Sequence, residues 1–503
     1  MISGKSSAPC LAVLGTGSDV GKSIVVTALC RILSNRGIRV APYKAQNMSN
    51  NSGVTPEGLE MGRAQIVQAE ACRIPPHVDM NPILLKPTSD VGSQVVVLGE
   101  AIANRTASEY HRQKESLFQT ACQALDRLRE SFDVVVLEGA GSCAEVNLMP
   151  HDIVNFRMAE YADAPVILVG DIHRGGIFAQ LIGTLACLPQ DCQDRIMGFI
   201  INRFRGDISL FADGTRWIEF RSGKTVFGVL PWVNQLGVEA EDSVVIENPV
   251  KPSGSDDGKP AIAILRIPHI SNFTDFDPLL RIPDISTSFI EQPMNLSRFN
   301  AVILPGSKNT CADLKWLHRT GWANHLQAYA GTGGHVLGIC GGYQMLGTQV
   351  HDPGGLEGAP GATDGLGLLP VETVLKSPKT TTLSEFEWMG IAGKGYEIHM
   401  GQTRLLTGSP MLTITARSGK TCHEPDGAQT DNFSVLGTYI HGLFDTPAIT
   451  RIWLDRIGLG HIAVSTDSGF IERDQAYNRL AEHFESHIDV ESIFSTFRSG
   501  IER

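Results

Sequence analysis

One cysteine stands where a strand could turn directly into a helix. Cys340 lies in "GICGGYQMLG", residues 338–347, with the apolar run "HVLGI" before it and two glycines and "YQML" after it. Small flanking residues permit the tight turn of a nucleophile elbow, and the amino end of a following helix favours a thiolate. These features predict a nucleophilic thiol. The alternative is an inert cysteine buried at a strand end.

A histidine and a glycine loop could supply the other groups that such a thiol needs. His441, in "GTYIHGLF", comes at the end of another apolar run. A nucleophile and a base far apart in sequence can meet at neighbouring strand ends. The loop "LPGSKNT" (304–310) would place the N–H of Gly306 beside that of Gly341, as two donors to an oxyanion. Together these features predict a Cys–His catalytic site.

A glycine-rich loop near the amino end predicts a different chemistry. "GTGSDVGKS" (15–23) follows an apolar run and opens a helical stretch, so its N–H groups can surround phosphate oxygens. Lys22 would reach the β- and γ-phosphates, and Ser23 would offer its hydroxyl to Mg²⁺. The two outer glycines enclose five residues instead of the usual four, so the loop is a variant. The residues predicted to contact the nucleotide here are Gly15, Thr16, Asp19, Gly21, Lys22 and Ser23.

Polar residues also follow other apolar runs of the first half. Glu138 ends the strand-like part of "VVVLEGAGS", where it could hold Mg²⁺ directly or through water. Lys44 begins the amide-rich stretch "KAQNMSNNS", which predicts the wall of a nucleotide site. Asn202, in "IINRFRGD", could bind a purine edge or form a turn. Arg174, in "DIHRGG", could bind a phosphate or carboxylate, or lie on the surface.

Short apolar runs bounded by Gly, Asp or Pro must position these groups. They are typical of buried parallel strands joined by helical crossovers. The first half predicts strands at 10–15, 39–44, 132–139, 164–171, 196–203 and 224–233, with helices at 22–36 and 114–130. The strand pattern restarts at 261–267, 300–306 and 334–340, and looks more antiparallel over 394–406 and 434–444.

The pattern predicts an α/β protein with two tandem α/β domains, as a length of 503 residues also suggests. We expect a phosphate-binding domain at 1–235, a linker at 236–260, a thiol domain at 261–450 and a helical extension at 451–503. The linker assignment rests on the Pro, Gly, Ser and charged residues of "ENPVKPSGSDDGKP".

Composition argues against several classes of function. A net charge of −12 does not favour broad binding of nucleic acid. No apolar run approaches the ~20 residues of a membrane span, and the amino-terminal stretch leads into the glycine loop rather than resembling a signal peptide. The ten cysteines contain no C-x-x-C pair, so we expect a cytoplasmic protein without disulfides or structural zinc.

The sequence resembles the cobyric/cobyrinic acid amidating family along nearly its whole length. The motifs "PGSKNT", "GICGGYQMLG", "GYEIHMG" and "TYIHGLF" of this chain resemble the class I glutamine amidotransferase domain of that family. The ATP-dependent half of the family's proteins is similar to dethiobiotin synthetase. This chain resembles that half in "GTGSDVGKS", "KAQNMS", "LEGAGS", "DIHRGGIFA" and "NRFRGD". Within the family, "KAQNMS" and "DIHRGG" favour the cobyric acid branch over the a,c-diamide branch.

This resemblance implies a reaction between small molecules. Glutamine is hydrolysed at Cys340 through a thioester, with His441 as base and then acid, and the ammonia passes to the other domain. There ATP, with Mg²⁺, activates the b, d, e and g carboxylates of adenosylcobyrinic acid a,c-diamide as acyl phosphates, which ammonia converts to amides. The resemblance also implies that Lys44 meets phosphate and substrate. A homo-oligomer is compatible with the sequence.

One position departs from the related triad amidotransferases. Those enzymes carry a glutamate two residues after the histidine to orient it, and this chain has Leu443 there. The corrinoid branch of the family lacks that acid. Glu397 and Asp445 are candidate substitutes.

Other functions fit parts of the sequence. An a,c-diamide synthase of the same family would act on the a and c carboxylates. A deviant P-loop ATPase switch with a non-catalytic amidotransferase-like domain would carry an additional lysine early in the loop, where this chain has Thr16 and Gly17. A switch or an inactive scaffold would also leave Cys340 and His441 unexplained.

Overall fold

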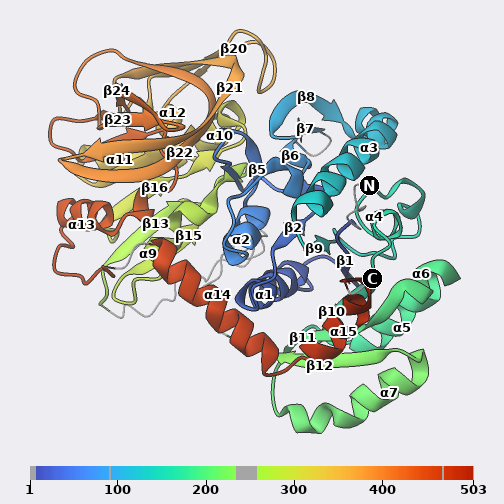
Figure 1. The fold of residues 1–503 in the computed structure, drawn as a ribbon. Coiled ribbons are helices and arrows are strands. Elements are labelled where there is room, and N and C mark those ends of the chain that lie inside the picture. Colours follow the sequence, from blue (N-terminus) through green and yellow to red (C-terminus); the bar gives the residue numbers. More distant parts are fainter. Residues whose placement is uncertain (1–6, 90–91, 234–257, 467–468, 502–503) are drawn as a thin grey trace.

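The protein folds into two lobes, each built on a largely parallel sheet (Figure 1). The computed structural model describes residues 7–89, 92–233, 258–466 and 469–501. The predicted linker at 236–260 lies almost entirely outside these residues. Two α/β domains with parallel sheets are therefore confirmed. None of the described helices combines the length and the apolar character that crossing a membrane requires.

The sheet of the first domain has six parallel strands in the order β12-β11-β10-β1-β9-β2. They are β1 (Cys10–Gly15), β2 (Val40–Tyr43), β9 (Val134–Glu138), β10 (Val166–Asp171), β11 (Ile196–Phe204) and β12 (Thr225–Pro231). All six strands predicted for the first half are thus confirmed. Because parallel strands all end at one edge, the polar residues that follow them gather at that edge.

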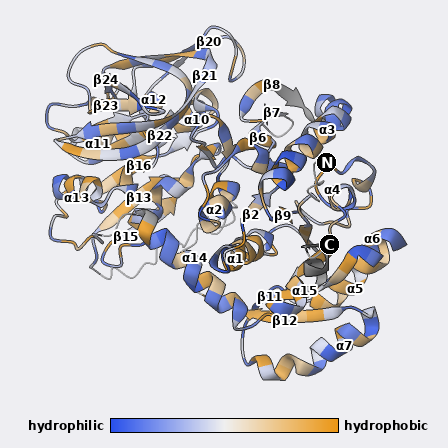
Figure 2. Ribbon diagram, in the orientation of Figure 1, coloured by the Kyte–Doolittle hydropathy of each residue, from blue (hydrophilic) through white to orange (hydrophobic). Residues whose placement is uncertain are grey.

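Helices accompany this sheet, and the two predicted ones are confirmed. They are α1 (Lys22–Asn35), α2 (Arg63–Ala71), α3 (Ala107–Ser131), α4 (Phe156–Tyr161), α5 (Ile177–Cys187), α6 (Gln190–Arg195) and α7 (Ala212–Ser222). Figure 2 colours much of α1 as hydrophobic and gives α3 and α7 long hydrophilic stretches. Helix α1 is accordingly buried on nearly all sides, while α3 and α7 are more exposed.

An insertion between β2 and α3 adds small strands that the sequence pattern did not reveal. One sheet contains β3 (Gln46–Met48), β6 (Ile83–Ser89), β7 (Gly92–Val97) and β8 (Glu100–Thr106). A hairpin pairs β4 (Ser52–Val54) with β5 (Glu60–Gly62). Strands β3, β4 and β5 have only three residues each, too few to show alternation, while β6 and β7 contain the short apolar runs "ILL" and "VVV" beside polar residues.

The sheet of the second domain has the order β15-β13-β16-β18-β26-β25. Its strands are β13 (Ala261–Leu265), β15 (Ser286–Ile290), β16 (Ala301–Leu304), β18 (His335–Ile339), β25 (Ala428–Gln429) and β26 (Val435–Thr438). Its helices include α10 (Thr310–Thr320), α11 (Trp322–Gly331), α12 (Gly341–Leu346) and α13 (Pro447–Arg456). A short stretch after β13 holds β14 (Ile270–Ser271), the 3-10 helix η4 (Phe273–Phe276) and α9 (Asp277–Leu280), with β14 pairing with β17 (Gly306–Ser307).

A second, mainly antiparallel sheet covers this domain. It contains β19 (Gln349–Asp352), β20 (Gly361–Asp364), β21 (Val371–Trp388), β22 (Ile391–Leu405), β23 (Leu412–Arg417) and β24 (Lys420–Asp426). The antiparallel expectation is confirmed for 394–406, which lies in β22. It is wrong in part for 434–444, because β26 pairs in parallel with β18 and antiparallel only with the short β25.

The chain returns to the first domain at its end. Figure 1 shows α14 (Gly469–Glu485) running from the second lobe to the first, followed by α15 (Val490–Ile501). Leu480 and Phe484 of α14 and Ile493 of α15 share one apolar core with Val25 and Leu29 of α1. The C-terminal helices therefore complete the core of the first domain, whereas α13 packs in the core of the second.

Replacing Phe484 by alanine should destabilise the first domain by about 3–5 kcal/mol, because this fully buried ring would leave a cavity between α14 and α1. Urea denaturation followed by circular dichroism would measure the loss. The matched control is Arg479→Ala on the exposed side of the same helix. Equal stability of the two variants would contradict a shared core.

Candidate active sites

Cys340 lies at the sharp turn between β18 and α12. Its backbone has φ 52° and ψ −109°, a conformation that residues with a side chain rarely adopt. A Cβ added to Gly341 would lie 2.6 Å from Ser307 N, and one added to Gly342 would lie 2.0 Å from Leu304 O. The glycines therefore let the turn press against the chain that follows β16. This is the geometry of a nucleophile elbow.

The imidazole of His441 is buried beside the sulfur of Cys340. Its Nδ1 lies 2.6 Å from Oδ2 of Asp275, whose other oxygen accepts a 3.0 Å hydrogen bond from Gly442 N. The ring of Tyr396 stacks on the imidazole at 5.1 Å, and the backbones of the two residues exchange hydrogen bonds. With Nδ1 donating to Asp275, Nε2 is the ring nitrogen that faces the thiol.

Neighbouring charges raise the pKa of His441 by more than its burial lowers it. Burial disfavours the imidazolium, but the Asp275 carboxylate and the Cys340 sulfur both favour it, and the pKa of His441 rises to about 10. A protonated imidazole beside the sulfur is placed to give its proton to a leaving group. The arrangement can therefore deliver a sulfur nucleophile and then a proton to a leaving group.

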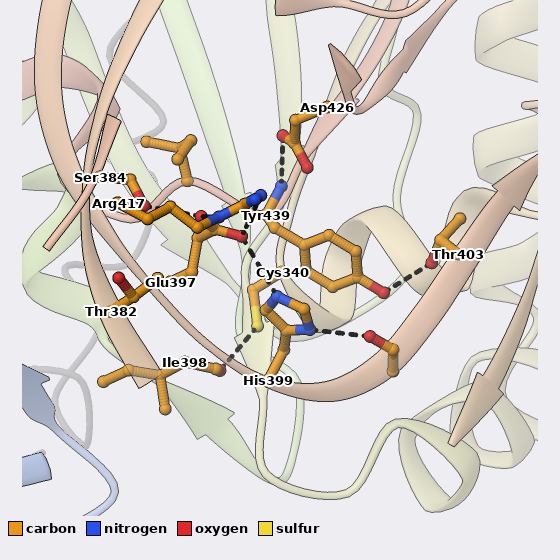
Figure 3. A network of polar contacts seen from close by, with 12 residues as sticks. Cys340, Thr382, Ser384, Glu397, Ile398, His399, Thr403, Arg417, Asp426 and Tyr439 are labelled. Carbon is orange, nitrogen blue, oxygen red and sulfur yellow. Dashed lines mark hydrogen bonds and ion pairs between the residues drawn. The ribbon is translucent and has the colours of Figure 1, made fainter. Parts of the chain in front are cut away.

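Neither acid suggested by the sequence orients His441. Glu397 points into a separate network, shown in Figure 3, and Asp445 lies 3.7 Å from Arg473. Glu397 contacts Ser384, His399 and Arg417. The suggestion of Glu397 or Asp445 is wrong because the position is filled by Asp275.

Sequence patterns did not point to Asp275, which lies 166 residues from its partner. The contact arises because η4 packs against the segment that carries His441. The only local signal was an aspartate between two phenylalanines, Phe273 and Phe276, both of which are buried.

The motif "GYEIHMG" of β22 borders the same site. The Ile398 carbonyl accepts a hydrogen bond from the Cys340 thiol at 3.5 Å (Figure 3). The ring of His399 stacks on Tyr439 with 3.7 Å between ring centroids. Together with the stacking of Tyr396 on the imidazole of His441, these contacts explain why an antiparallel strand carries part of the site's sequence signature.

A pocket of about 470 Å³, measured to its open mouth, contains both Cys340 and His441. Lys308 and Glu357 bring a basic and an acidic group to its wall, and Lys86 of the first domain also lines it. Burial lowers the pKa of Lys308 to about 8 and raises the pKa of Glu357 to about 7. The pocket thus lies where the two domains meet.

The glycines predicted to donate to an oxyanion lie at the elbow. A Cβ on Gly306 would be 3.2 Å from Cε1 of His441, and one on Gly341 would touch the residue after Gly306. The structure brings both glycines to the nucleophile. Their role as oxyanion donors stays a prediction.

The predicted phosphate loop joins the carboxyl end of β1 to α1. Gly15 ends the strand, Thr16 donates its N–H to Val169 O at 3.0 Å, and Lys22 begins the helix. Lys22 Nζ donates to Gly17 O at 2.9 Å and to Gly141 O at 3.0 Å. The ammonium is thus held across the mouth of the loop.

Asn202 supports this loop from the neighbouring strand end. Gly21 has φ 94°, and a Cβ there would lie 2.1 Å from Asn202 Nδ2, so only glycine fits. The same amide nitrogen donates to Val20 O at 2.9 Å, and the amide oxygen accepts from the N–H of Arg203. The predicted contact of Asn202 with a purine stays a prediction.

The acid at the end of β9 lies beneath the loop. Ser23 Oγ and Lys44 Nζ each lie 2.8 Å from Oε1 of Glu138, and Gln68 donates to its other oxygen. Burial opposes the charge on Glu138, but Lys44 and the two neutral donors keep the pKa of this carboxyl below its usual range. The structure therefore joins three residues that the sequence had proposed separately, and adds Gln68.

Arginines gather on the other side of the loop. Asp19 accepts from Arg203 at 2.7 Å and lies 3.6 Å from Arg174, while Arg203 also reaches Asp171 at 2.9 Å. Arg203 was not singled out from the sequence, although it follows Asn202 directly. The pairing of Asp19 with arginines places cationic groups beside the phosphate loop.

The oxygen ligands present fit Mg²⁺. Within the described residues no three or more His, Cys, Asp and Glu side chains gather as a metal cage. Mg²⁺ at nucleotide sites takes one or two protein oxygens, together with phosphate oxygens and water. The paired Ser23 hydroxyl and Glu138 carboxylate supply such oxygens.

Comparison with known protein families assigns the two halves of the chain separately. Residues 11–244 match the CobQ/CobB/MinD/ParA nucleotide binding domain. Residues 261–449 match the CobB/CobQ-like glutamine amidotransferase domain. The two matches coincide with the phosphate loop and the Cys340 elbow.

Relatives that are similar over almost their whole length bear one name. A cobyric acid synthase of Chlorobium phaeobacteroides (strain BS1) is 52% identical, over 97% of this chain and 99% of its own. Cobyric acid synthases of Chlorobaculum tepidum and Yersinia enterocolitica are 49% and 46% identical, each over at least 96% of both chains. With both domains and the whole length matched, this chain belongs to the cobyric acid synthase family.

Proposed function

We propose that this chain uses ATP and glutamine to amidate the b, d, e and g carboxylates of adenosylcobyrinic acid a,c-diamide, giving adenosylcobyric acid. The observation that carries the proposal is the Cys340–His441–Asp275 arrangement in the same chain as a phosphate-binding loop. A carboxylate is a poor electrophile until it is phosphorylated, and neutral ammonia is scarce in water near pH 7. One chain with both sites meets both requirements.

The thiol site would release ammonia from glutamine. The Cys340 thiolate attacks the side-chain amide carbon, and His441 gives its proton to the departing ammonia, which leaves a thioester. His441 then takes a proton from water as the water attacks, and glutamate leaves with the thiol restored. The N–H groups of Gly306 and Gly341 would stabilise the oxyanion in both steps. Asp275 keeps the imidazole in the orientation and tautomer that both steps need.

The charges of the pocket suit the other end of glutamine. Free glutamine carries an α-carboxylate and an α-ammonium, so a pocket that binds it gains from one cationic and one anionic group. In the cavity that holds Cys340, Lys308 provides the cationic group, and Glu357 provides the anionic group when its carboxyl is ionised. We propose that they select the free amino acid over amides that lack these charges.

The loop site would activate the corrinoid carboxylates. Lys22 would leave its two carbonyl partners for phosphate oxygens, and Lys44 would help to neutralise the transferred phosphoryl group. Ser23 and Glu138 would hold Mg²⁺, which when bound neutralises charge on the phosphates. The intact thiol site gives no support to a non-catalytic switch or scaffold.

Cys340→Ala should abolish amidation with glutamine, by at least about 10³-fold, and leave amidation with added ammonium salt intact. The sulfur is needed only to release ammonia. Product formation with each nitrogen source, followed by mass spectrometry of the corrinoid, makes the comparison. Cys187→Ala, at an exposed cysteine, is the control. Loss of both routes would mean that the thiol domain is not a separable source of ammonia.

Lys22→Ala should remove amidation from both nitrogen sources by about 10²-fold or more, because phosphate charge would no longer be neutralised at the loop. ATP-dependent product formation measures this directly. Lys224→Ala, at a partly exposed lysine of the same domain, serves as the control. If amidation survives in Lys22→Ala, the glycine-rich loop does not take part in the reaction.

Asp275→Asn should lower glutamine hydrolysis by about 10²–10⁴-fold, since His441 loses its orienting carboxylate. The pKa of His441 should also fall, because the carboxylate favours the imidazolium. The basic limb of the pH–rate profile should therefore move to lower pH.

The pH profile separates this role from a purely structural one. Asp275→Glu should move the basic limb part of the way back towards its wild-type pH. Asp284→Asn, at an exposed site, should leave the pH–rate profile unchanged. A slower Asp275→Asn enzyme with an unshifted profile would refute the assignment.

A further inference from the structure

Buried amide side chains lie between the two sites. Asn51 is 2% exposed, and Gln65 and Gln68 are fully buried. Gln65 and Gln68 are three residues apart on α2 and therefore share one face of that helix. The backbone of Asn51 accepts a hydrogen bond from the N–H of Arg63, the first residue of α2. We call Asn51, Gln65 and Gln68 the amide row.

One end of the amide row meets the thiol pocket. Asn272 lines that pocket, and its Oδ1 accepts a 3.1 Å hydrogen bond from Ser52 N. Thr274, the neighbour of Asp275, donates to Asn51 Oδ1 at 3.4 Å. Asn51 thus lies directly across the domain boundary from the chain segment that orients the catalytic histidine.

The other end of the row meets the phosphate site. Gln68 donates to the Glu138 carboxylate, which also binds Ser23 and Lys44. Figure 1 shows α2 lying between α1 and the second lobe. At about 1.5 Å per residue, the nine residues of α2 span roughly 13 Å, so one short helix links the two ends.

The amide row contains polar atoms without partners. Asn51 Nδ2, Gln65 Nε2 and Gln68 Oε1 are buried and form no hydrogen bond. With Asn50 Oδ1 and Gln94 Oε1, this stretch of the first domain holds five of the six such atoms in the part of the chain that the structure describes. Buried polar groups are otherwise nearly always paired, so this concentration indicates a place for a small polar guest.

Neutral amides suit ammonia as that guest. Ammonia both donates and accepts hydrogen bonds, and the row offers two unpaired donors and one unpaired acceptor. Amides do not protonate it, whereas an unpaired carboxylate would stabilise ammonium, which is not a nucleophile. Glu60, beside Ser52, is already neutralised by Lys86 at 2.6 Å and Lys379 at 2.7 Å.

We propose that Asn51, Gln65 and Gln68 line the passage through which neutral ammonia released at Cys340 reaches the phosphate site. The inference rests on the proposed function, because it needs one site that releases ammonia and another that consumes it. In this passage the amides hold ammonia transiently by hydrogen bonds and keep it from bulk water.

Gln65→Met tests the passage while preserving side-chain length and approximate volume. Glutamine hydrolysis and amidation with added ammonium salt should both stay at the wild-type rate. The amount of amide formed per glutamate released should fall at least about threefold, because ammonia escapes instead of arriving at a high local concentration. Glutamate, corrinoid amide and free ammonia are measured in the same reaction.

Two further variants keep the test decisive if Gln65→Met folds poorly. Asn51→Leu removes the amide at the other end of the row and should leak ammonia in the same way. Gln190→Met changes an exposed glutamine and should keep wild-type coupling. Thermal unfolding confirms that the compared variants are folded.

Each outcome has a separate meaning. If both folded variants form as much amide per glutamate released as the wild type, the proposed passage is wrong. It is also wrong if the ammonium-dependent reaction falls as much as the glutamine-dependent one, because the amides would then belong to the synthetase site. If the wild-type protein neither hydrolyses glutamine nor uses ammonium, the proposed function itself fails. Leakage confined to the amide-row variants supports the passage.

Discussion

The hydrogen bond between Asp275 and His441 links the site around Cys340 to the packing of the two domains against each other. Asp275 belongs to η4, which is anchored by the buried rings of Phe273 and Phe276. The same short segment bonds to the first domain through Asn272 and Thr274. A change in how the domains meet would therefore also move the carboxylate that orients the imidazole of His441.

The two sites differ in how their buried charges are balanced. In the first domain the buried Glu138 is balanced by Lys44, and Lys22 is held by carbonyl oxygens that phosphate can replace. In the second, the charge of Asp275 sustains an imidazolium next to a sulfur nucleophile. In the proposed reaction each site supplies one half of an amide bond, the activated carboxylate or the nitrogen.

Packing also joins the two halves of the protein. The C-terminal helices leave the amidotransferase domain and fill a core around α1, the helix that begins with Lys22. Fully buried Arg31 of α1 is ion-paired with Asp474 at 2.6 Å. The first domain is thus completed by residues that follow the second domain in the sequence. The interdomain arrangement is supported from two sides, by these helices and by the contacts of η4.

By itself the sequence determined most of the two parallel sheets and the local site elements, including the phosphate loop and the Cys340 elbow. These features depend on apolar runs, glycines and residues next to one another, so they leave a readable pattern. Only the tertiary structure decided that Asp275 orients His441 and that Glu138 is shared by Lys44 and Ser23. It also placed the polar strands of the insertion. Contacts between distant segments depend on how helices and sheets pack, and packing has no periodic signature in a single chain.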